Sequence, residues 1–308
     1  MADLLWSEIQ KKAKKNIAAL VFNSELNYDH QIYTIAQDIY DNHNIKLILM
    51  AGPSASGKTT SCDLIAERLE YLGIKTHRLS TDDFFLDRDD TPKLPNGLYD
   101  FDSINAIDVY GLQQCLAKLL KGESVRLPRF DFINGKSCPD GRFIEMNAGE
   151  DIIILEGIHA LNPLLIAGFD YSPDEICRIS IAPRRNVKMS DGKVLTPDDI
   201  RLIRRTIRDH YTRGYTPDQT ARQWIAVLES EQKYIYPYFD NVDYAIDSIH
   251  EYELILYKLC LGDILNEAYS VLFDNIKAVL QEVITMPISS IPTTSLLNEV
   301  AAFGKFAK

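Results

Sequence analysis

Residues 47–60 read LILMAGPSASGKTT, an apolar run followed by a turn of glycine and small residues. Within this stretch, Gly52-Pro53-Ser54-Ala55-Ser56-Gly57-Lys58-Thr59 matches the pattern G-x-x-x-x-G-K-[ST] in full. The run LILMA predicts a buried strand, and the segment TTSCDLIAERLEYL after the lysine predicts a helix. A preceding strand and a following helix are the context that separates a phosphate-binding loop from a chance match.

The motif predicts a nucleotide site. Its glycines let backbone N–H groups turn toward phosphate oxygens, and the helix N-terminus adds partial positive charge. We expect Lys58 to reach the β and γ phosphates and Thr59 to hold Mg²⁺. The predicted nucleotide-binding residues are Gly52, Ser54, Ala55, Ser56, Gly57, Lys58, Thr59 and Thr60. The motif alone does not separate a kinase from a switch GTPase or an ATP-driven machine, although the N-K-x-D guanine motif is missing from the sequence.

Outward from the loop, residues 46–248 alternate short apolar runs with helical stretches, which predicts βαβ units and a largely parallel sheet. We expect an α/β fold of the P-loop NTPase type, with helices on both faces of the sheet. Two segments rich in Pro, Gly, Asn and Asp, 87–100 and 128–141, predict loops. The expected strands are 47–51, 76–80, 151–156, 176–182 and 243–247, and the expected helices are 58–71, 105–120, 198–212 and 217–234.

Helical extensions are expected on both sides of this core. In the first extension, apolar residues at helical spacing predict two helices, the first marked by Leu5, Ile9, Ile17 and Leu20 and the second by Ile32, Ile35, Ile39 and Tyr40. The second extension returns to helical spacing in YELILYKLCLGDIL. The predicted division is an extension at 1–45, a core at 46–248 with an arginine-rich segment at about 197–216, and an extension at 249–308.

Composition narrows the class of protein. The chain of 308 residues carries 33 Lys and Arg against 44 Asp and Glu, a net charge of −11, which argues against general binding to nucleic acid or to an anionic membrane. Five widely spaced cysteines without a C-x-x-C pair predict reduced thiols. With no signal peptide and no apolar run of membrane-spanning length, we expect a cytoplasmic protein. Monomer and homo-oligomer both stay open.

Acidic residues follow two of the predicted strands. Glu156 ends DIIILE, where a carboxylate facing Mg²⁺ is expected, and the alternative is a strand-end side chain in solvent. Asp82 and Asp83 follow THRLS. A carboxylate there would accept a proton from an attacking hydroxyl or cap a turn, and spacing alone leaves both interpretations open.

Arginines are concentrated between residues 201 and 213. Four of them share a helix face at i, i+3, i+4 and i+7, and the complete set is Arg201, Arg204, Arg205, Arg208 and Arg213. Local neutralisation by Asp198, Asp199 and Asp209 is one interpretation. Next to a phosphate loop, we favour a mobile basic lid that closes on the transferred phosphate, with Gly214 as its hinge or C-cap.

The order of motifs resembles a known family. TDDFF, YDFDSINAID, RLPRFDF, LEGIHAL, RLIRRTIRDHYTRG and QTARQW follow the phosphate loop as in the uridine kinase and phosphoribulokinase family of P-loop kinases. The likeness is greatest to the bacterial uridine-kinase-like nucleoside kinases. The tail IPTTSLLNEV also resembles the end of those proteins. Larger members carry a threonyl-tRNA-synthetase-like region at their N-terminus, and this chain resembles a version without it.

The resemblance implies an enzyme that uses ATP and Mg²⁺ to phosphorylate a small-molecule acceptor. It implies that Asp82 is the catalytic base, that Asp102 binds ribose hydroxyls and that Gln223 lies on the base side of a nucleoside. The implied metal ligands are Thr59, Asp82 and Glu156, and the implied lid arginines are Arg205, Arg208 and Arg213.

Three positions depart from the family pattern. Phe130 stands where uridine kinases have an aromatic residue with a hydroxyl, Gly135 lies near an expected histidine, and Tyr215 replaces an expected arginine. Hydrogen bonds of this kind dominate discrimination between substrates. We therefore expect intact phosphoryl-transfer machinery with an altered acceptor pocket. The leading acceptor is the 5′-hydroxyl of a uridine- or cytidine-like nucleoside, and the alternatives are ribulose 5-phosphate as acceptor or a non-catalytic ATP sensor.

Overall fold

The computed structural model describes residues 2–94, 97, 99–169, 171–262, 264–286, 288 and 291–301. Its centre is a parallel sheet of five strands: β2 (Leu47–Ala51), β3 (Thr76–Ser80), β8 (Ile152–Glu156), β9 (Ile176–Ala182) and β12 (Tyr244–Asp247). In space the order is β12-β9-β2-β8-β3, so the strand before the phosphate loop is central. Each strand begins and ends within one residue of its predicted bounds, and the predicted α/β class is confirmed.

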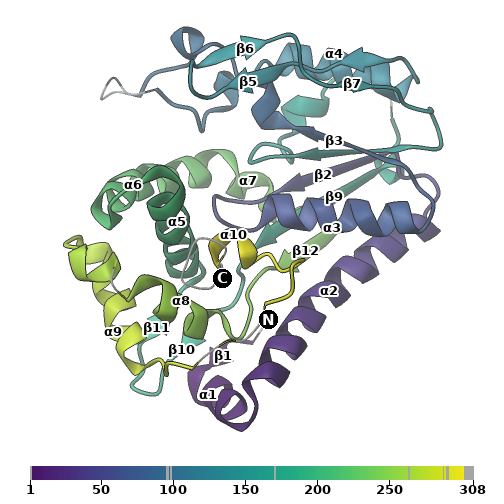
Figure 1. Cartoon of the computed structure of the whole chain (residues 1–308). Coiled ribbons are helices and arrows are strands. Elements are labelled where there is room, and N and C mark those ends of the chain that lie inside the picture. The colour runs from purple at the N-terminus through teal and green to yellow at the C-terminus, as the bar shows by residue number, and fades with distance from the viewer. Residues whose placement is uncertain are drawn as a thin grey trace.

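Helices surround the sheet and fill both ends of the chain (Figure 1). Of the four core helices predicted with bounds, three lie within one residue of them, whereas α4 begins four residues later than expected, at Val109, with Asp108 as its N-cap. The helices are α1 (Trp6–Lys15), α2 (Ile17–Asp41), α3 (Lys58–Tyr71), α4 (Val109–Leu120), α5 (Pro197–Arg213), α6 (Pro217–Tyr234), α7 (Tyr236–Phe239), α8 (Glu253–Leu261), α9 (Asp274–Glu282) and α10 (Asn298–Ala301).

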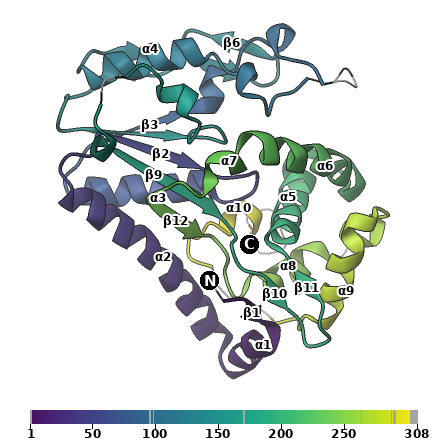
Figure 2. The same cartoon turned by 180° about the vertical axis from the view of Figure 1, so that it is seen from behind.

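The two faces of the sheet pack into different cores because side chains alternate along a strand. On β2, Ile48 and Met50 join the cluster that contains α2 and α3, whereas Leu47 and Leu49 join the cluster that contains α4. Figures 1 and 2 show α2 and α3 on one side of the sheet and α4 on the other. Helices therefore cover both faces, as the apolar, non-alternating strand sequences predict.

Among the described residues, the short strands form three small sheets outside the main sheet. One predicted loop, 128–141, contains a hairpin, because Asp131 accepts backbone and side-chain hydrogen bonds that close a turn in a composition typical of loops. The short strands are β1 (Leu4–Leu5), β10 (Val187–Lys188) and β11 (Val194–Leu195) in one sheet, β4 (Val125–Arg126) with β7 (Phe143–Ile144), and β5 (Arg129–Asp131) with β6 (Lys136–Cys138).

The helical ends pack on the core rather than beside it. Trp6 of α1, Ile32 of α2 and Leu256 of α8 lie in the same buried cluster as Ile48 and Ile154 of the sheet. The first two helices meet at Asn16, whose side chain caps α2. The apolar set predicted for one helix is therefore divided, with Leu5 in β1, Ile9 in α1, and Ile17 and Leu20 in α2. Packing is continuous across residues 45 and 248, and the three-part division stays a prediction.

Two further observations concern the chain as a whole. All five cysteines lie in the described part of the chain and none of them forms a disulfide. Among the described residues, the model contains no helix with both the length and the apolar character needed to cross a membrane.

Candidate functional site

Three segments named by the sequence meet at one edge of the sheet. The phosphate loop follows β2, Glu156 ends the adjacent strand β8, and Asp82 follows β3 on the far side of β8. In the strand register Glu156 pairs with Met50 of β2 and with Ser80 of β3. Because the strands are parallel, all three segments leave the sheet at its carboxyl edge, where α/β folds bind ligands.

The phosphate loop needs its glycines for steric reasons. A Cβ at Gly52 would overlap the carbonyl oxygen of Ile181 on the neighbouring strand. Gly57 has a φ of +92° as the N-cap of α3, a conformation that favours glycine. Ala55 also has a positive φ, +59°, so the loop keeps one strained non-glycine residue of the kind that gathers at functional sites.

The phosphate loop is held against α5, the helix that carries the five arginines, by a buried ion pair between Arg201 and Glu231. The Ser54 N–H donates to Glu231 at 2.9 Å, and Arg201 Nε donates to the Ser54 carbonyl oxygen at 3.0 Å. Arg201 Nη2 also donates to both carboxylate oxygens of Glu231 at 2.6 Å, and the two side chains are 1% and 4% exposed. Trp224 of α6 lies against the Arg201 guanidinium. This cluster fixes the loop before any ligand binds.

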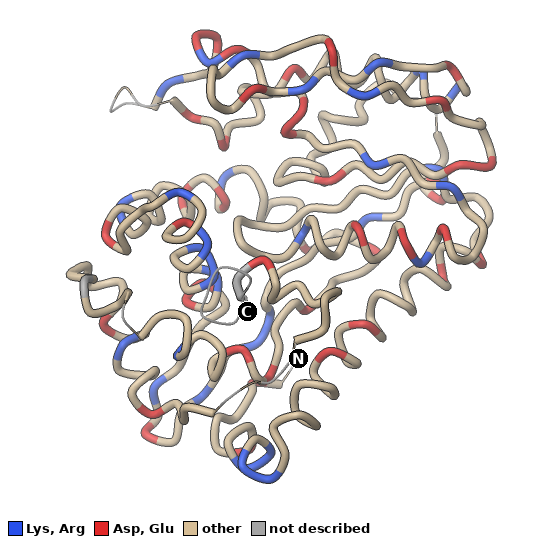
Figure 3. Tube along the Cα trace, in the orientation of Figure 1, with Lys and Arg blue, Asp and Glu red and all other residues tan. Residues whose placement is uncertain are grey.

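Arg204 makes a second buried ion pair behind the loop. Its guanidinium donates to Glu253 at 2.8 Å, to the Tyr257 hydroxyl at 2.9 Å, to Ser248 and to the Ala55 carbonyl oxygen. Figure 3 shows Lys and Arg recurring along α5 beside the centre of the molecule. Two of the five arginines on this helix therefore bind protein groups in the interior.

The other three arginines surround Asp209, which is fully buried. Arg205, Arg208 and Arg213 approach its carboxylate at 3.3, 3.0 and 3.2 Å. Gly214 ends α5 with a φ of +67°, so it is a C-cap. Asp209 therefore offsets part of the positive charge of these arginines, while the exposed side-chain fraction rises from 11% at Arg205 to 31% and 48% at the other two.

Arg205 is the member of this group that reaches the loop. Its Nη1 donates to the Ser54 hydroxyl at 3.0 Å and its Nη2 to Gln223 Oε1 at 3.3 Å. The structure thus brings Arg205 to the phosphate loop, with Gln223 beside Arg205, and Arg205 also acts electrostatically on Asp102. Gln223, which the resemblance places beside a base, here contacts an arginine of α5.

The acidic residues and Lys58 influence one another's pKa values. Ser80 caps the turn Thr81–Phe84 by accepting from the Asp82 N–H, so the capping role belongs to Ser80. Asp82 keeps contact with solvent, yet protein atoms crowd its carboxyl. That desolvation, followed by the charge of Glu156, raises the pKa of Asp82 to about 6. Burial lowers the pKa of Lys58, and the charges of Glu156 and Asp82 oppose the shift.

Asp102 lies on the loop that faces these groups. Desolvation raises its pKa to about 6, Arg205 opposes that rise, and Asp100 and Glu231 add to it. Lys58 also acts on Asp102, which places this carboxyl in the same field as the phosphate loop. Asp102 can therefore accept hydrogen bonds from a polar ligand bound next to the loop.

An aromatic cluster borders the Asp82 turn. Phe85 lies 5.4 Å from Phe130 and 6.1 Å from Phe101 between ring centroids, and Phe132 contacts both Phe85 and Phe130. Phe130 is buried, whereas Phe132 is 63% exposed. These rings form an apolar wall that suits a flat, weakly polar group.

The other two departures from the family pattern have structural roles. Gly135 donates its N–H to the Asp131 carbonyl oxygen at 2.7 Å and closes the turn of the β5–β6 hairpin. Tyr215 donates its N–H to the Asp209 carbonyl oxygen at 3.2 Å and so completes the C-terminal cap of α5.

Sequence reasoning missed Glu231, which binds both the loop and Arg201. A signal was present, since Glu231 continues the buried stripe of α6 formed by Thr220, Ala221, Trp224 and Val227. A carboxylate at a buried helical position requires a buried partner. The hydrogen bond from the Thr60 hydroxyl to Glu299 in the C-terminal segment was missed as well.

Comparison with known proteins defines the family. The family model "Phosphoribulokinase / Uridine kinase family" matches residues 47–254, more than half of the chain. The chain belongs to the phosphoribulokinase / uridine kinase family. The matched range begins with the first residue of β2 and ends at the second residue of α8, so it includes the phosphate loop, Asp82, Glu156 and the whole of α5 and α6.

Relatives of this family member include two curated proteins. One is "Uridine kinase-like protein 4" of Arabidopsis thaliana, 31% identical over 63% of this chain and 35% of that protein. The other is "Uridine kinase" of Schizosaccharomyces pombe, 31% identical over 64% of this chain and 37% of that protein. The chain thus spans little more than a third of these relatives' length. Among solved structures, D-glycerate 3-kinase from Cryptococcus neoformans has a TM-score of 0.47 at 18% identity, covering 69% of this chain and 89% of that chain.

Proposed function

We propose that this member of the phosphoribulokinase / uridine kinase family is an ATP-dependent kinase of a small-molecule hydroxyl, with the 5′-hydroxyl of a uridine- or cytidine-like nucleoside as acceptor. The observation that carries the proposal is the meeting of the phosphate loop, Glu156 and Asp82 at the ends of three adjacent parallel strands. A phosphoryl-transfer site needs a phosphate cradle, a metal-holding carboxylate and a group that orients the nucleophile, and this edge supplies all three.

In this proposal the acceptor hydroxyl attacks the γ-phosphorus of ATP. Its oxygen forms the new P–O bond as the bond to the β-phosphate oxygen breaks, ADP leaves, and Asp82 takes the hydroxyl proton. Lys58 neutralises charge on the β and γ phosphates. Arg205, with Arg208 and Arg213 behind it, stabilises charge that spreads over the transferred group.

The donor set also fits Mg²⁺. Thr59, Asp82 and Glu156 offer a hydroxyl and two carboxylates, the hard oxygen ligands that this ion prefers. The charge of Glu156 already acts on the pKa of Asp82, so a cation between them relieves repulsion. When bound there, Mg²⁺ supplies positive charge that offsets the charge of the phosphates.

Two features favour a nucleoside over a phosphorylated acceptor such as ribulose 5-phosphate. The aromatic wall around Phe130 suits a base, and Asp102 can accept hydrogen bonds from sugar hydroxyls. Arg201 and Arg204 are held in buried ion pairs with Glu231 and Glu253, so they are not free to bind a second phosphate. A protein that binds ATP without catalysis does not need the two carboxylates, Asp82 and Glu156, beside the expected position of the γ-phosphate.

A coupled assay with Mg·ATP and a panel of uridine, cytidine, ribulose 5-phosphate and pantothenate tests the proposal. We expect turnover with a pyrimidine nucleoside. Asp82→Asn should lose about 10²- to 10⁴-fold in turnover and still bind ATP, because the phosphate loop and Lys58 are unchanged. Asp83→Asn is the matched control and should keep most activity. Full activity of Asp82→Asn, or no product with any acceptor, contradicts the proposal.

A further inference from the structure

The C-terminal residues 291–301, which we call the strap, lie across the beginning of the phosphate-loop helix. The Thr60 hydroxyl donates a hydrogen bond to the Glu299 carboxylate, across 239 positions of sequence. Leu296 packs over the loop, since a Cβ at Gly57 would lie 3.3 Å from Leu296 Cδ1. Figure 1 shows α10, which carries Glu299, beside the start of α3 and close to α5.

The strap is docked at its middle. Leu296 and Leu297 are 1% and 0% exposed and belong to the main hydrophobic core. The Ser295 hydroxyl donates to Glu25 at 2.7 Å, and Glu25 also accepts from the Tyr252 hydroxyl at 2.6 Å. These contacts fix the position from which Glu299 reaches Thr60.

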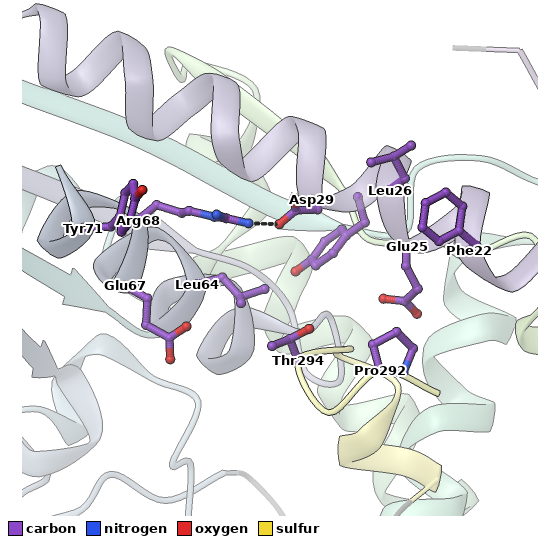
Figure 4. Close-up of a pocket in the computed structure, with 11 residues that line it drawn as sticks. Phe22, Glu25, Leu26, Asp29, Leu64, Glu67, Arg68, Tyr71, Pro292 and Thr294 are labelled. Carbon is purple, nitrogen blue, oxygen red and sulfur yellow. Dashed lines mark hydrogen bonds and ion pairs between the residues drawn. The ribbon is translucent and has the colours of Figure 1, made fainter. Parts of the chain in front are cut away.

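Both ends of the strap are less firmly held. Glu299 is an exposed residue in a helix of only four residues. On the other side, Pro292 and Thr294 border an open pocket of about 510 Å³ between α2 and α3 (Figure 4). The opposite wall of this pocket includes Phe22 and Leu64 as well as the charged residues Glu67 and Arg68, and the open space between leaves this side of the strap uncovered. The strap can therefore shift while its leucines stay buried.

Glu299 stands where a nucleotide must bind. The first turn of the helix after a G-x-x-x-x-G-K-[ST] loop receives nucleotide phosphates, because its N–H groups and its dipole attract anions. A carboxylate on Thr60 makes the same kind of contact as a phosphate oxygen. Glu299 also belongs to the negative charges that act on Lys58, so its field extends to the lysine expected to bind the β and γ phosphates.

We propose that the strap is an autoinhibitory element in which Glu299 occupies part of the nucleotide phosphate site and must leave Thr60 before ATP binds. The inference rests on the proposed nucleotide site but not on the acceptor or on turnover. ATP and Glu299 are two anions that compete for one helix N-terminus. Nucleotide binding and docking of Glu299 on Thr60 are therefore linked, and each opposes the other to the same extent.

Fluorescent nucleotide titration tests the strap without any catalysis. Glu299→Gln and a chain ending at Leu297 should each bind mant-ATP with Mg²⁺ about three- to tenfold more tightly than the full chain, the scale of one exposed charge contact. Glu123→Gln, an exposed carboxylate in the turn after α4, is the control and should bind like the full chain. Equal or weaker binding by both strap variants overturns the inference.

Hydrogen exchange on the full chain gives a second readout that needs no variant. Addition of Mg·ATP should raise amide exchange at residues 298–301 while the segment around Leu296 stays protected. Unchanged or slower exchange at 298–301 with ATP bound shows that the strap does not leave, and the inference is then wrong. Failure of the chain to bind ATP at all contradicts the nucleotide site itself, so the two failures are distinguishable.

Discussion

The buried ion pair between Arg204 and Glu253 gives a sharp test of how α5 is held. The two side chains are 2% and 1% exposed, and Arg204 Nη2 donates to Glu253 at 2.8 Å and to the Ser248 carbonyl oxygen at 2.8 Å. Arg204→Met keeps most of the side-chain volume and removes the charge. Glu253 then keeps the Tyr257 hydroxyl and the His250 N–H but has no cation.

The expected loss in the free energy of unfolding is about 3–5 kcal/mol, the usual cost of leaving one charge buried without its partner. Glu253→Gln added to Arg204→Met removes that stranded charge. The double variant should therefore recover about 2 kcal/mol relative to Arg204→Met alone, a coupling typical of groups in one hydrogen-bond network. A smaller cost remains, because the Ser248 carbonyl oxygen still lacks its donor.

Urea unfolding followed by circular dichroism and by tryptophan fluorescence measures these changes. Arg208→Met is the matched control, because this arginine is 31% exposed and Asp209 keeps Arg205 and Arg213. Its loss should be about 1 kcal/mol or less. Equal losses for the two arginine variants, or strictly additive effects in the double variant, would refute the assignment of Arg204 as an interior anchor.

Two further predictions concern Asp102, on the proposed acceptor side of the site, and His159, a buried histidine that follows β8. Asp102→Asn should raise the KM for a nucleoside at least about tenfold, the effect of one lost charged hydrogen bond, while the dissociation constant of ATP stays unchanged; a parallel loss of ATP affinity would contradict the acceptor role. Desolvation lowers the pKa of His159 to about 4, below its ordinary 6.5, so the unfolded chain takes up the proton first. Because of this group, the free energy of unfolding should fall by about 3 kcal/mol as the pH drops from 6.5 to 4. His159→Phe should not show this part of the pH dependence. If the urea midpoints of the unaltered protein and of His159→Phe fall in parallel as the pH is lowered, His159 is not the group responsible.

The sheet and the phosphate loop could be predicted from sequence because their signals are local. Strands buried on both faces are continuous apolar runs, so LILMA and DIIILE were placed within one residue. The helix α3 was predicted with its observed bounds for a related reason. Gly57 at its start adopts a positive φ. Gly73, which follows the C-cap Leu72, also has a positive φ and ends the helical pattern.

The partners of the charged residues could not be predicted, because helical spacing defines a face but not what covers it. Arg201 and Arg204 share the buried stripe of α5 with Ile200, Ile203 and Ile207, which the sequence already shows. Their carboxylate partners lie 30 and 49 residues away on other helices. The contact between Thr60 and Glu299 spans most of the chain, and no local pattern records it.

The anchoring of α5 limits how a basic lid can act. Arg201 and Arg204 bind carbonyl oxygens of the phosphate loop, so the first half of the helix cannot swing away without breaking two buried ion pairs. In the proposed reaction, the positive charge for the transferred phosphate then comes from the arginines around Asp209. We expect Arg205 and its neighbours to exchange the buried carboxylate for a phosphate by side-chain rotation, a change that needs no rigid-body movement of the helix.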